Sequence, residues 1–130
     1  MLSSYFKGDL QTIEKELAAS IQAEDPLLQE ASLHLLKAGG KRIRPVFVLL
    51  AAKFGDYDIQ KVKKAAASLE LIHMASLVHD DVIDNALLRR GAPTIQALWD
   101  NKVAMYTGDY IFARSFELMT DIKIPKAHQL

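Results

Sequence analysis

The stretch that decides the fold lies at residues 59–85 and reads IQKVKKAAASLELIHMASLVHDDVIDN. Its middle is apolar on nearly every face, so it predicts one long helix that other helices surround. Asp58 stands immediately before it, in the position of a helix-capping residue. At 1.5 Å per residue this helix spans roughly 40 Å, which is long for so small a domain.

Apolar residues at helical spacing predict further helices on both sides of this stretch. They are expected through Leu10, Ile13, Leu17 and Ile21, from Pro26 to a glycine stop at 39–40, from near Pro45 to Gly55, and over residues 101–120. Thr94 is expected to cap a short turn that reaches Trp99. Because the chain shows no strand-like alternation, repeat or low-complexity segment, the expected fold class is all-α.

The composition is that of one globular domain. Half of the 130 residues are apolar, a quarter are charged and the net charge is zero, so no overall field favours nucleic acid or an anionic membrane. The absence of cysteine excludes disulfides and thiolate metal sites. The longest apolar run, residues 46–52, is too short for a transmembrane segment, which needs about 20 residues. With no secretory signal pattern at the N-terminus, a cytoplasmic location is expected.

Three acids stand near the end of the long helix. Helix spacing places Asp80 and Asp84 on one face, with Cβ atoms ~5–6 Å apart. Two such carboxylates suit Mg²⁺, which prefers oxygen ligands and is usually completed by water and substrate phosphates. With Asp81 between them and Arg89 and Arg90 following, the cluster predicts a site for a magnesium-bound diphosphate. The alternative is a network of caps and salt bridges between a helix end and the next loop.

A second cluster, GGKRIRP at residues 39–45, is rich in basic groups. Lys41, Arg42 and Arg44 would project near a helix start, where free N–H groups and the helix dipole favour an anion. Arginine offers a bidentate fork and lysine a compact charge, so both suit phosphate oxygens. The alternative is a glycine stop followed by solvated basic side chains.

Glu70 and His73 form an ExxH pair on the long helix. In a four-helix bundle such a pair can be half of a di-iron site, but that site needs a second ExxH, and the sequence has none. His73 lies two turns before Asp80 on nearly the same face, which suits a histidine that donates to a phosphate. A buried histidine bonded to a backbone carbonyl is the alternative.

Together these motifs resemble the trans-prenyl (polyprenyl) diphosphate synthases, of the medium- or long-chain type. The resemblance rests on GGKRIRP, ELIHMASLVHDDVID, LLRRGAPT and the helix around Thr107-Gly108-Asp109, and it extends from about residue 30 to the end. It implies antiparallel helices around a deep cavity, Mg²⁺ as cofactor, and condensation of isopentenyl diphosphate with an allylic diphosphate such as farnesyl diphosphate. A quinone side chain would be the usual use of a long product.

The resemblance also implies a role for each matching residue. Asp80 and Asp84 resemble the family's magnesium ligands, with Asp81 as a weaker partner, and Arg89 resembles the contact to the allylic diphosphate. The residues that resemble the isopentenyl diphosphate pocket are Lys41, Arg44, His73 and Arg90. The departing diphosphate is thought to take the proton in this family, so no protein base is expected.

The product chain should run from the acids back toward the start of the long helix. Ala75 and Ser76 are small, so neither should block a tunnel near its mouth. Ile72 and Leu69, one and two turns deeper, are the first bulky candidates for its floor. These positions predict a medium-to-long product, although packing between helices would also explain a small residue at position 75.

One family motif is missing from the sequence. No second aspartate-rich motif follows Asp84, since Asp100, Asp109 and Asp121 are isolated. Residues 1–130 are therefore expected to be the N-terminal part of a single synthase domain, with half of the cavity and no activity alone. The alternative is a natural substrate-binding or partner subunit. Exposed apolar surface would favour association with another chain. The resemblance implies that this is a homodimer, or a heteromer with a small second component.

Overall fold

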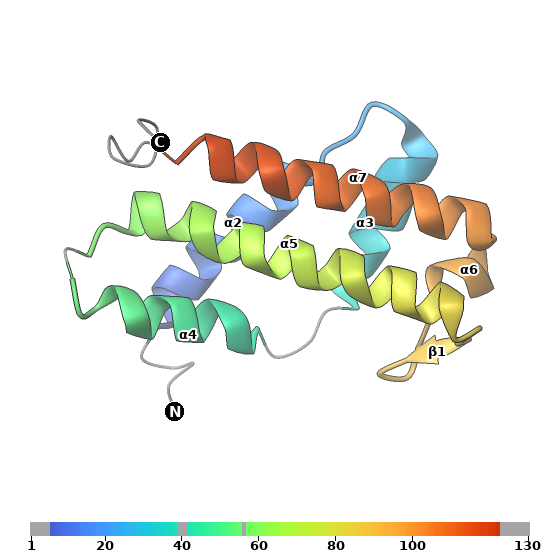
Figure 1. Ribbon diagram of the computed structural model, residues 1–130, viewed down its shortest axis with the longest axis horizontal. Helices are drawn as coiled ribbons and strands as arrows, with labels where there is room; N and C mark the ends of the chain where they lie inside the picture. The colour runs from blue at the N-terminus through green and yellow to red at the C-terminus, as the bar shows by residue number, and fades with distance from the viewer. Residues whose placement is uncertain (1–5, 39–41, 56, 123–130) are drawn as a thin grey trace.

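The longest helix, α5 (Ile59–Ile83), passes through the middle of the molecule, and the other helices are arranged around it (Figure 1). The computed structural model describes residues 6–38, 42–55 and 57–122. Asp58 caps α5 as predicted, because its side chain accepts a hydrogen bond of 3.0 Å from the Gln60 backbone N–H. The described chain is mainly helical, which confirms the all-α fold class.

The remaining helices lie close to their predicted positions. They are α2 (Lys7–Ser20), α3 (Pro26–Lys37), α4 (Ile43–Ala52), α6 (Ile95–Leu98) and α7 (Asn101–Thr120). Helix α7 runs antiparallel to α5 and makes the most extensive contact with it, while α2 and α4 pack against the first half of α5 (Figure 1). Asp25 caps α3 before Pro26 at its first turn, where a missing N–H costs nothing.

Two boundaries differ from the sequence-based prediction. Helix α4 begins at Ile43 and ends at Ala52, rather than running from near Pro45 to Gly55. The proline therefore lies within the first turn, where it needs no hydrogen-bond donor. The predicted glycine stop at residues 39–40 lies outside the described residues.

A small β-hairpin follows α5 where no strand was predicted. Its strands, β1 (Leu88–Arg89) and β2 (Ala92–Pro93), pair antiparallel across a turn in which Arg90 and Gly91 have φ of 53° and 80°. Positive φ at both central residues is typical of tight hairpin turns. Two-residue strands are too short to leave an alternating pattern in the sequence, and the prediction therefore missed them.

Thr94 does not cap α6 as predicted. Its hydroxyl donates instead to the Ala86 carbonyl at 2.8 Å, and no side-chain capping bond is present at the start of α6. Thr94 is itself buried. This bond ties the end of the hairpin back to the loop that leaves α5, which fixes the hairpin beside the acidic end of that helix.

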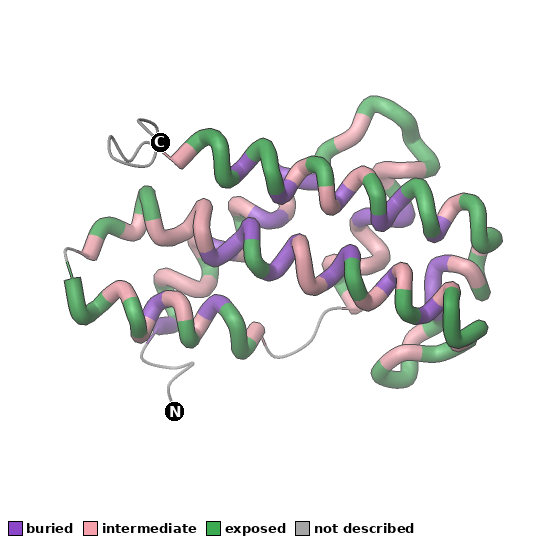
Figure 2. The backbone as a smooth tube through the Cα atoms, viewed as in Figure 1, coloured by how far each residue is buried: buried purple, intermediate pink, exposed green. Residues whose placement is uncertain are grey.

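Buried residues of α5 recur from Ala66 to Asp81 (Figure 2). The main cluster joins α5 to α2, α4 and α7, and it includes Leu17, Leu49, Leu71, Ala75 and Ile111. A second cluster packs the acidic end of α5 against α3, α6 and α7, and it includes Ala31, Val78, Ile95 and Ala104. Both ends of α5 are thus anchored by apolar contacts.

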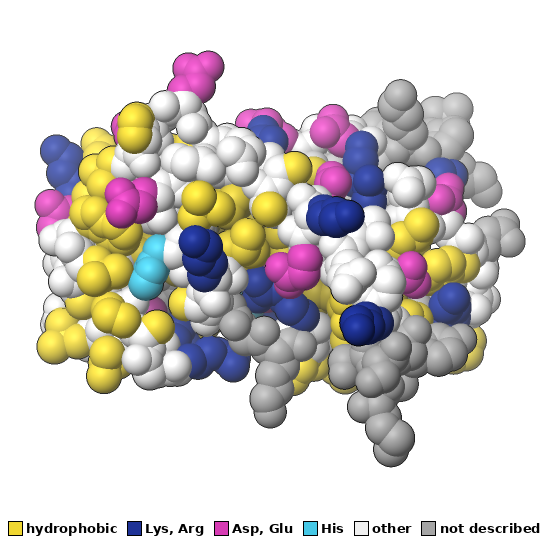
Figure 3. Space-filling view, turned by 180° about the vertical axis from the view of Figure 1, so that it is seen from behind, with side chains coloured by type: hydrophobic (Ala, Val, Ile, Leu, Met, Phe, Trp, Pro, Cys, Tyr) yellow, Lys and Arg dark blue, Asp and Glu magenta, His cyan; other side chains and the backbone are white. Residues whose placement is uncertain are grey.

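The surface combines dispersed charge with local apolar exposure. On the face shown in Figure 3, basic and acidic side chains are interspersed, and hydrophobic side chains gather at the end that holds α3 and α6. Large apolar side chains are also exposed elsewhere, among them Phe47, Phe54, Leu69 and Ile83. None of the described helices combines the length and hydropathy needed to span a membrane.

Candidate functional site

The last turn of α5 carries the three acids in two different environments. Asp80 and Asp84 are exposed, whereas Asp81 is buried, with 7% of its surface accessible. Among the described residues, no hydrogen bond or ion pair engages the carboxylates of Asp80 and Asp84. The acid turn (residues 80–84) therefore presents the unpaired carboxylates of Asp80 and Asp84 to solvent, whereas the Asp81 carboxylate is buried.

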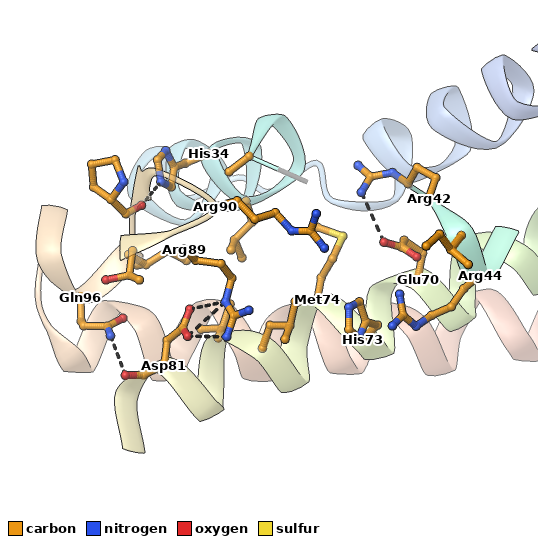
Figure 4. A pocket seen from close by; sticks show the side chains of 18 residues that line it. His34, Arg42, Arg44, Glu70, His73, Met74, Asp81, Arg89, Arg90 and Gln96 are labelled. Carbon is orange, nitrogen blue, oxygen red and sulfur yellow. Dashed lines mark hydrogen bonds and ion pairs between the residues drawn. The ribbon is translucent and has the colours of Figure 1, made fainter. Parts of the chain in front are cut away.

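The buried carboxylate of Asp81 binds Arg89 in the adjacent hairpin (Figure 4). Arg89 Nε donates to Oδ2 at 2.9 Å and Nη2 donates to Oδ1 at 2.7 Å, which is a bidentate pair. The hydrogen bond with Asp81 is the main cause of a raised pKa for Arg89, and Asp80 and Asp84 add to it. Nη1 takes no part in this pair, so Arg89 can hold Asp81 and still offer N–H donors to an anion.

A cavity of about 130 Å³ lies beside this pair, between α3, the start of α4, α5 and the hairpin. Arg44 from α4, His73 from α5, and Arg89 and Arg90 from the hairpin all line it (Figure 4). The structure thus brings together the described basic residues that the family resemblance assigned to the two diphosphates. Lys41 lies outside the described residues.

The surroundings of His73 in this cavity disfavour its protonated form. Burial lowers its pKa from 6.5, and Arg44, Arg89 and Arg90 lower it further, while the nearby charge of Glu70 opposes them. A neutral imidazole keeps one N–H donor and avoids adding a cation to three arginines. An anion that enters the cavity would reverse the balance and favour the protonated ring.

Arg42, one of the predicted phosphate-binding bases, is instead used inside the fold. Its guanidinium forms an ion pair with Glu14 of α2, contacts Glu70 Oε1 at 3.3 Å, and donates to the Leu36 carbonyl at 3.2 Å. Arg42 also has φ of 55°, which is uncommon for a non-glycine residue. The network ties the start of α4 to α2, α3 and α5, and so orients Arg44 toward His73.

Glu70, the acid of the ExxH motif, is paired with Arg42. Glu70 is buried, with 3% of its surface accessible, and lies against a guanidinium rather than a second metal-binding motif. Within residues 6–38, 42–55 and 57–122, no three histidine or acidic side chains gather closely enough to hold a metal by themselves. The di-iron interpretation therefore has no support in this part of the chain.

The acid turn suits Mg²⁺ that is bound only partly by protein, rather than a metal ion that protein ligands enclose completely. Asp80 and Asp84 supply two hard oxygen donors on adjacent turns of one face, with no competing partner among the described residues. Mg²⁺ usually binds one or two carboxylates and completes its octahedron with water and phosphate oxygens. The donor set is thus suited to a cation that arrives with a phosphorylated ligand.

The residues predicted to set the length of the product differ in how far they are buried. Leu69 and Ser76 are exposed and Ile72 is half-buried, so these three follow one open side of α5 back from Asp80. Ala75 is fully buried in the main core cluster with Ile111 of α7. Its small size is therefore explained by helix packing in this structure.

Gln96 supports the acid turn but was not predicted from the sequence. Its side-chain amide donates to the Asp81 carbonyl at 2.8 Å and to the Ala86 carbonyl at 2.6 Å. His34 similarly contacts the Pro93 carbonyl at 2.7 Å and fixes the far strand of the hairpin. No local sequence pattern signals either contact, because the partners are distant in the chain and only the hairpin brings them together.

Comparison with known proteins places this site in a family context. The family model described as polyprenyl synthetase matches residues 25–130. Heptaprenyl diphosphate synthase component 2 of Bacillus subtilis is 63% identical over 130 residues, which are 100% of this chain and 37% of that protein. The chain thus spans well under half the length of this relative.

Solved structures have the same fold as this chain and are similar to it in sequence. The heptaprenyl diphosphate synthase of Staphylococcus aureus matches with a TM-score of 0.87 and 42% identity, over 95% of this chain and 40% of that one. The polyprenyl synthase of Caulobacter crescentus, complexed with calcium and isoprenyl diphosphate, matches with a TM-score of 0.90 and 34% identity, over 98% and 39% of the two chains. On these matches and on the geometry of its acid turn and basic cavity, the chain belongs to the polyprenyl synthetase family.

Proposed function

We propose that this chain supplies one wall of the active site of a trans-prenyltransferase that condenses isopentenyl diphosphate with an allylic diphosphate. The observation that carries the proposal is the position of an open acid turn beside a basic cavity, joined through the Asp81–Arg89 pair. The turn suits a metal-bound diphosphate and the cavity suits a second one. Each substrate of such a condensation carries one diphosphate.

Two relatives support this proposal. The Caulobacter crescentus structure contains calcium and isoprenyl diphosphate, so a divalent cation and a diphosphate ester occur together in a structure that shares this fold. The Bacillus subtilis relative is named component 2 of its synthase, which supports a heteromer with another component. Pairing with a second copy of the chain is the other assembly that the exposed apolar side chains would favour.

The acid turn would hold magnesium through Asp80 and Asp84. When bound there, Mg²⁺ supplies Lewis-acid stabilisation of the diphosphate that leaves the allylic substrate. Arg89, kept in place by Asp81, presents its free N–H groups to the same leaving group as a fixed cation. As the allylic C–O bond breaks and diphosphate leaves, the double bond of isopentenyl diphosphate attacks the allylic carbon. The departing diphosphate would take the proton that is lost when the new double bond forms.

The basic cavity would hold isopentenyl diphosphate. Arg44 from α4 and Arg90 from the hairpin supply positive charge to the same cavity, and His73 of α5 supplies an N–H donor there. Lys41 is included by its place in the GGKRIRP motif. Carbon–carbon bond formation needs the two substrates in register, and fixing each diphosphate on a separate set of residues achieves this.

We infer that catalysis requires the rest of a family-length synthase. No second aspartate-rich motif follows Asp84 in this sequence, and relatives are more than twice as long. The open side of α5, with Asp80, Asp84, Ser76 and Leu69, would then face the other half of the cavity. The alternative is a subunit that binds substrate without catalysis.

Turnover of labelled isopentenyl diphosphate with farnesyl diphosphate and Mg²⁺ tests the proposal. The family-length synthase that contains this chain should form a labelled long-chain product, and a chelator should abolish it. The 130-residue chain alone should bind inorganic diphosphate without turnover. If the family-length protein formed no product, with or without a second component, the proposed catalytic role would be wrong and the binding-subunit alternative would remain.

The pKa of His73 provides a second test. Bound diphosphate should raise this pKa, because negative charge then offsets the three arginines that lower it. The added affinity is fully present below the pKa of the free state and is lost as pH rises through the pKa of the bound state. NMR titration of the His73 ring with and without inorganic diphosphate measures the shift. An unchanged or lower pKa in the bound state would contradict this assignment.

Product length can be tested at two neighbouring positions. Ser76→Phe should shorten the product of the family-length synthase, because position 76 lies on the open side of α5 one turn from Asp80. Ala75→Phe should mainly lower thermal stability, by about 1–3 kcal/mol, since a ring must be forced into the packed core. Chromatography of the products and thermal melts of both variants separate these effects. A shortened product from a stable Ala75→Phe protein would instead place the tunnel at position 75.

A further inference from the structure

Helices α5 and α7 approach each other closely at Gly108, beside the acid turn. A Cβ atom built on Gly108 would lie 2.5 Å from His79 Nε2 and 2.7 Å from His79 Cδ2. Real Cβ atoms do not make such contacts, so the His79 ring occupies the space that any larger residue would need. The glycine is buried in an otherwise regular helix, where glycine is less favourable than alanine. The close approach is the physical reason for a glycine there.

Asp109 adds a polar partner to this contact. His79 Nε2 lies 3.2 Å from Asp109 Oδ1, although the two groups are not aligned as a hydrogen bond. The carboxylate is 66% exposed, so the pair contributes little stability, but it favours one orientation of the ring. Thus His79 and the Gly108-Asp109 pair, which were quoted in the sequence motifs without a role, meet in one place.

His79 lies on the same helix end as Asp80 and Asp84, so a rotation that moves His79 also moves these two carboxylates. His79 directly precedes Asp80, and at about 100° per residue its ring lies on a different side of α5 from the two unpaired carboxylates. Rotating the helix end by about 10° would move an atom roughly 6 Å from the axis by about 1 Å. A misplacement of that size can lower a rate about 100-fold when reacting groups must be aligned.

The Asp81–Arg89 pair and the Gln96 contact restrain the acid turn on the side of the hairpin. On the side of α7, apolar packing alone would hold the rotation weakly. Val78 and Val82 bury the adjacent side of the helix in the second core cluster, but apolar burial is not directional. The His79 ring lies between the backbone of α7 at Gly108 and the Asp109 carboxylate. These two contacts restrict the rotation of the end of α5 as well as its distance from α7. We propose that His79, seated on Gly108 and oriented by Asp109, is a positioning residue that aims Asp80 and Asp84 at one metal ion. This inference rests on the proposed function and adds a determinant of metal affinity to it.

Variants at positions 79 and 108 of the family-length synthase test the proposal. Gly108→Ala should raise the Mg²⁺ concentration for half-maximal activity about 10-fold, because its methyl group displaces the ring, and His79→Ala should do the same. The double variant should be no worse than His79→Ala, since the methyl group then enters vacated space. The KM for isopentenyl diphosphate should stay constant in all three.

Control variants separate positioning from packing. Gly55→Ala should leave the Mg²⁺ dependence unchanged, because nothing described lies within 4 Å of the added Cβ. Asp109→Asn keeps the fold and should give a smaller shift of roughly 3-fold, consistent with an exposed pair. His79→Gln retains an N–H donor and should recover part of the lost Mg²⁺ affinity.

The outcomes for the two proposals are distinct. A lower melting temperature with unchanged Mg²⁺ dependence in Gly108→Ala and His79→Ala would overturn the positioning role and leave the proposed function intact. Additive losses in the double variant would also overturn it, because they would show that the two residues act separately. Absence of Mg²⁺-dependent turnover in the unmodified synthase would overturn the proposed function itself.

Discussion

Asp80→Asn in the family-length synthase is expected to reduce turnover about 100- to 1,000-fold, the cost typical of losing one group that stabilises developing charge. The amide keeps the size of the carboxylate but removes the negative charge that attracts Mg²⁺. The exposed carboxylate of Asp80 has no partner among the described residues, so stability should change little. Steady-state assays across a range of Mg²⁺ concentrations, with thermal melts in parallel, measure both effects.

Asp121→Asn is the matched control for this prediction. Asp121 is also an exposed acid near a helix end, but it lies at the end of α7, away from the acid turn. Its replacement should leave turnover and Mg²⁺ dependence unchanged. Equal losses from Asp80→Asn and Asp121→Asn would show that acidic surface charge in general matters, and would remove the metal-binding role from Asp80.

Arg89→Ala is expected to lose both activity and stability. Turnover should fall roughly 100-fold, because the cation that faces the leaving diphosphate is absent. The Asp81 carboxylate, only 9% exposed, would be left without its bidentate partner, which costs about 1–3 kcal/mol. Assays of the family-length synthase and denaturant titrations measure the two losses separately.

A double variant distinguishes the two roles of Arg89. Arg89→Ala combined with Asp81→Ala removes the uncompensated buried charge, so part of the lost stability should return while turnover stays low. If activity recovers together with stability, Arg89 serves only to neutralise Asp81 and does not contact substrate. Arg89→Lys should give an intermediate turnover, because lysine keeps the charge without the planar fork.

The sequence predicted the helices well because their signals are local. The apolar length of α5, the capping position of Asp58 and the proline at the start of α3 each determine structure within a few residues. The hairpin was missed because its strands are two residues long and depend on positive φ at Arg90 and Gly91. The start of α4 was placed two residues late, since Pro45 fits any position in a first turn.

The residues of the site were predicted from the sequence, but the contacts between their side chains were not. Helix spacing predicted that Asp80 and Asp84 share a face, and α5 is a regular helix from Ile59 to Ile83. His73 lines the cavity with Asp81, which the spacing did not single out. The spacing could not show that Asp81 is buried against Arg89, or that Arg42, at the edge of the cavity, is paired with Glu14 and Glu70. Those contacts depend on how separate elements pack, which local spacing does not encode.

A crystal structure of the family-length synthase with Mg²⁺ and an unreactive allylic diphosphate analogue tests the central claim most directly. The account predicts a magnesium ion bound by the carboxylates of Asp80 and Asp84 at about 2.1 Å, with diphosphate oxygens completing its coordination. Arg89 should contact the same diphosphate while still paired with Asp81. A metal ion bound away from the acid turn, or an allylic diphosphate held without Asp80 and Asp84, would contradict it.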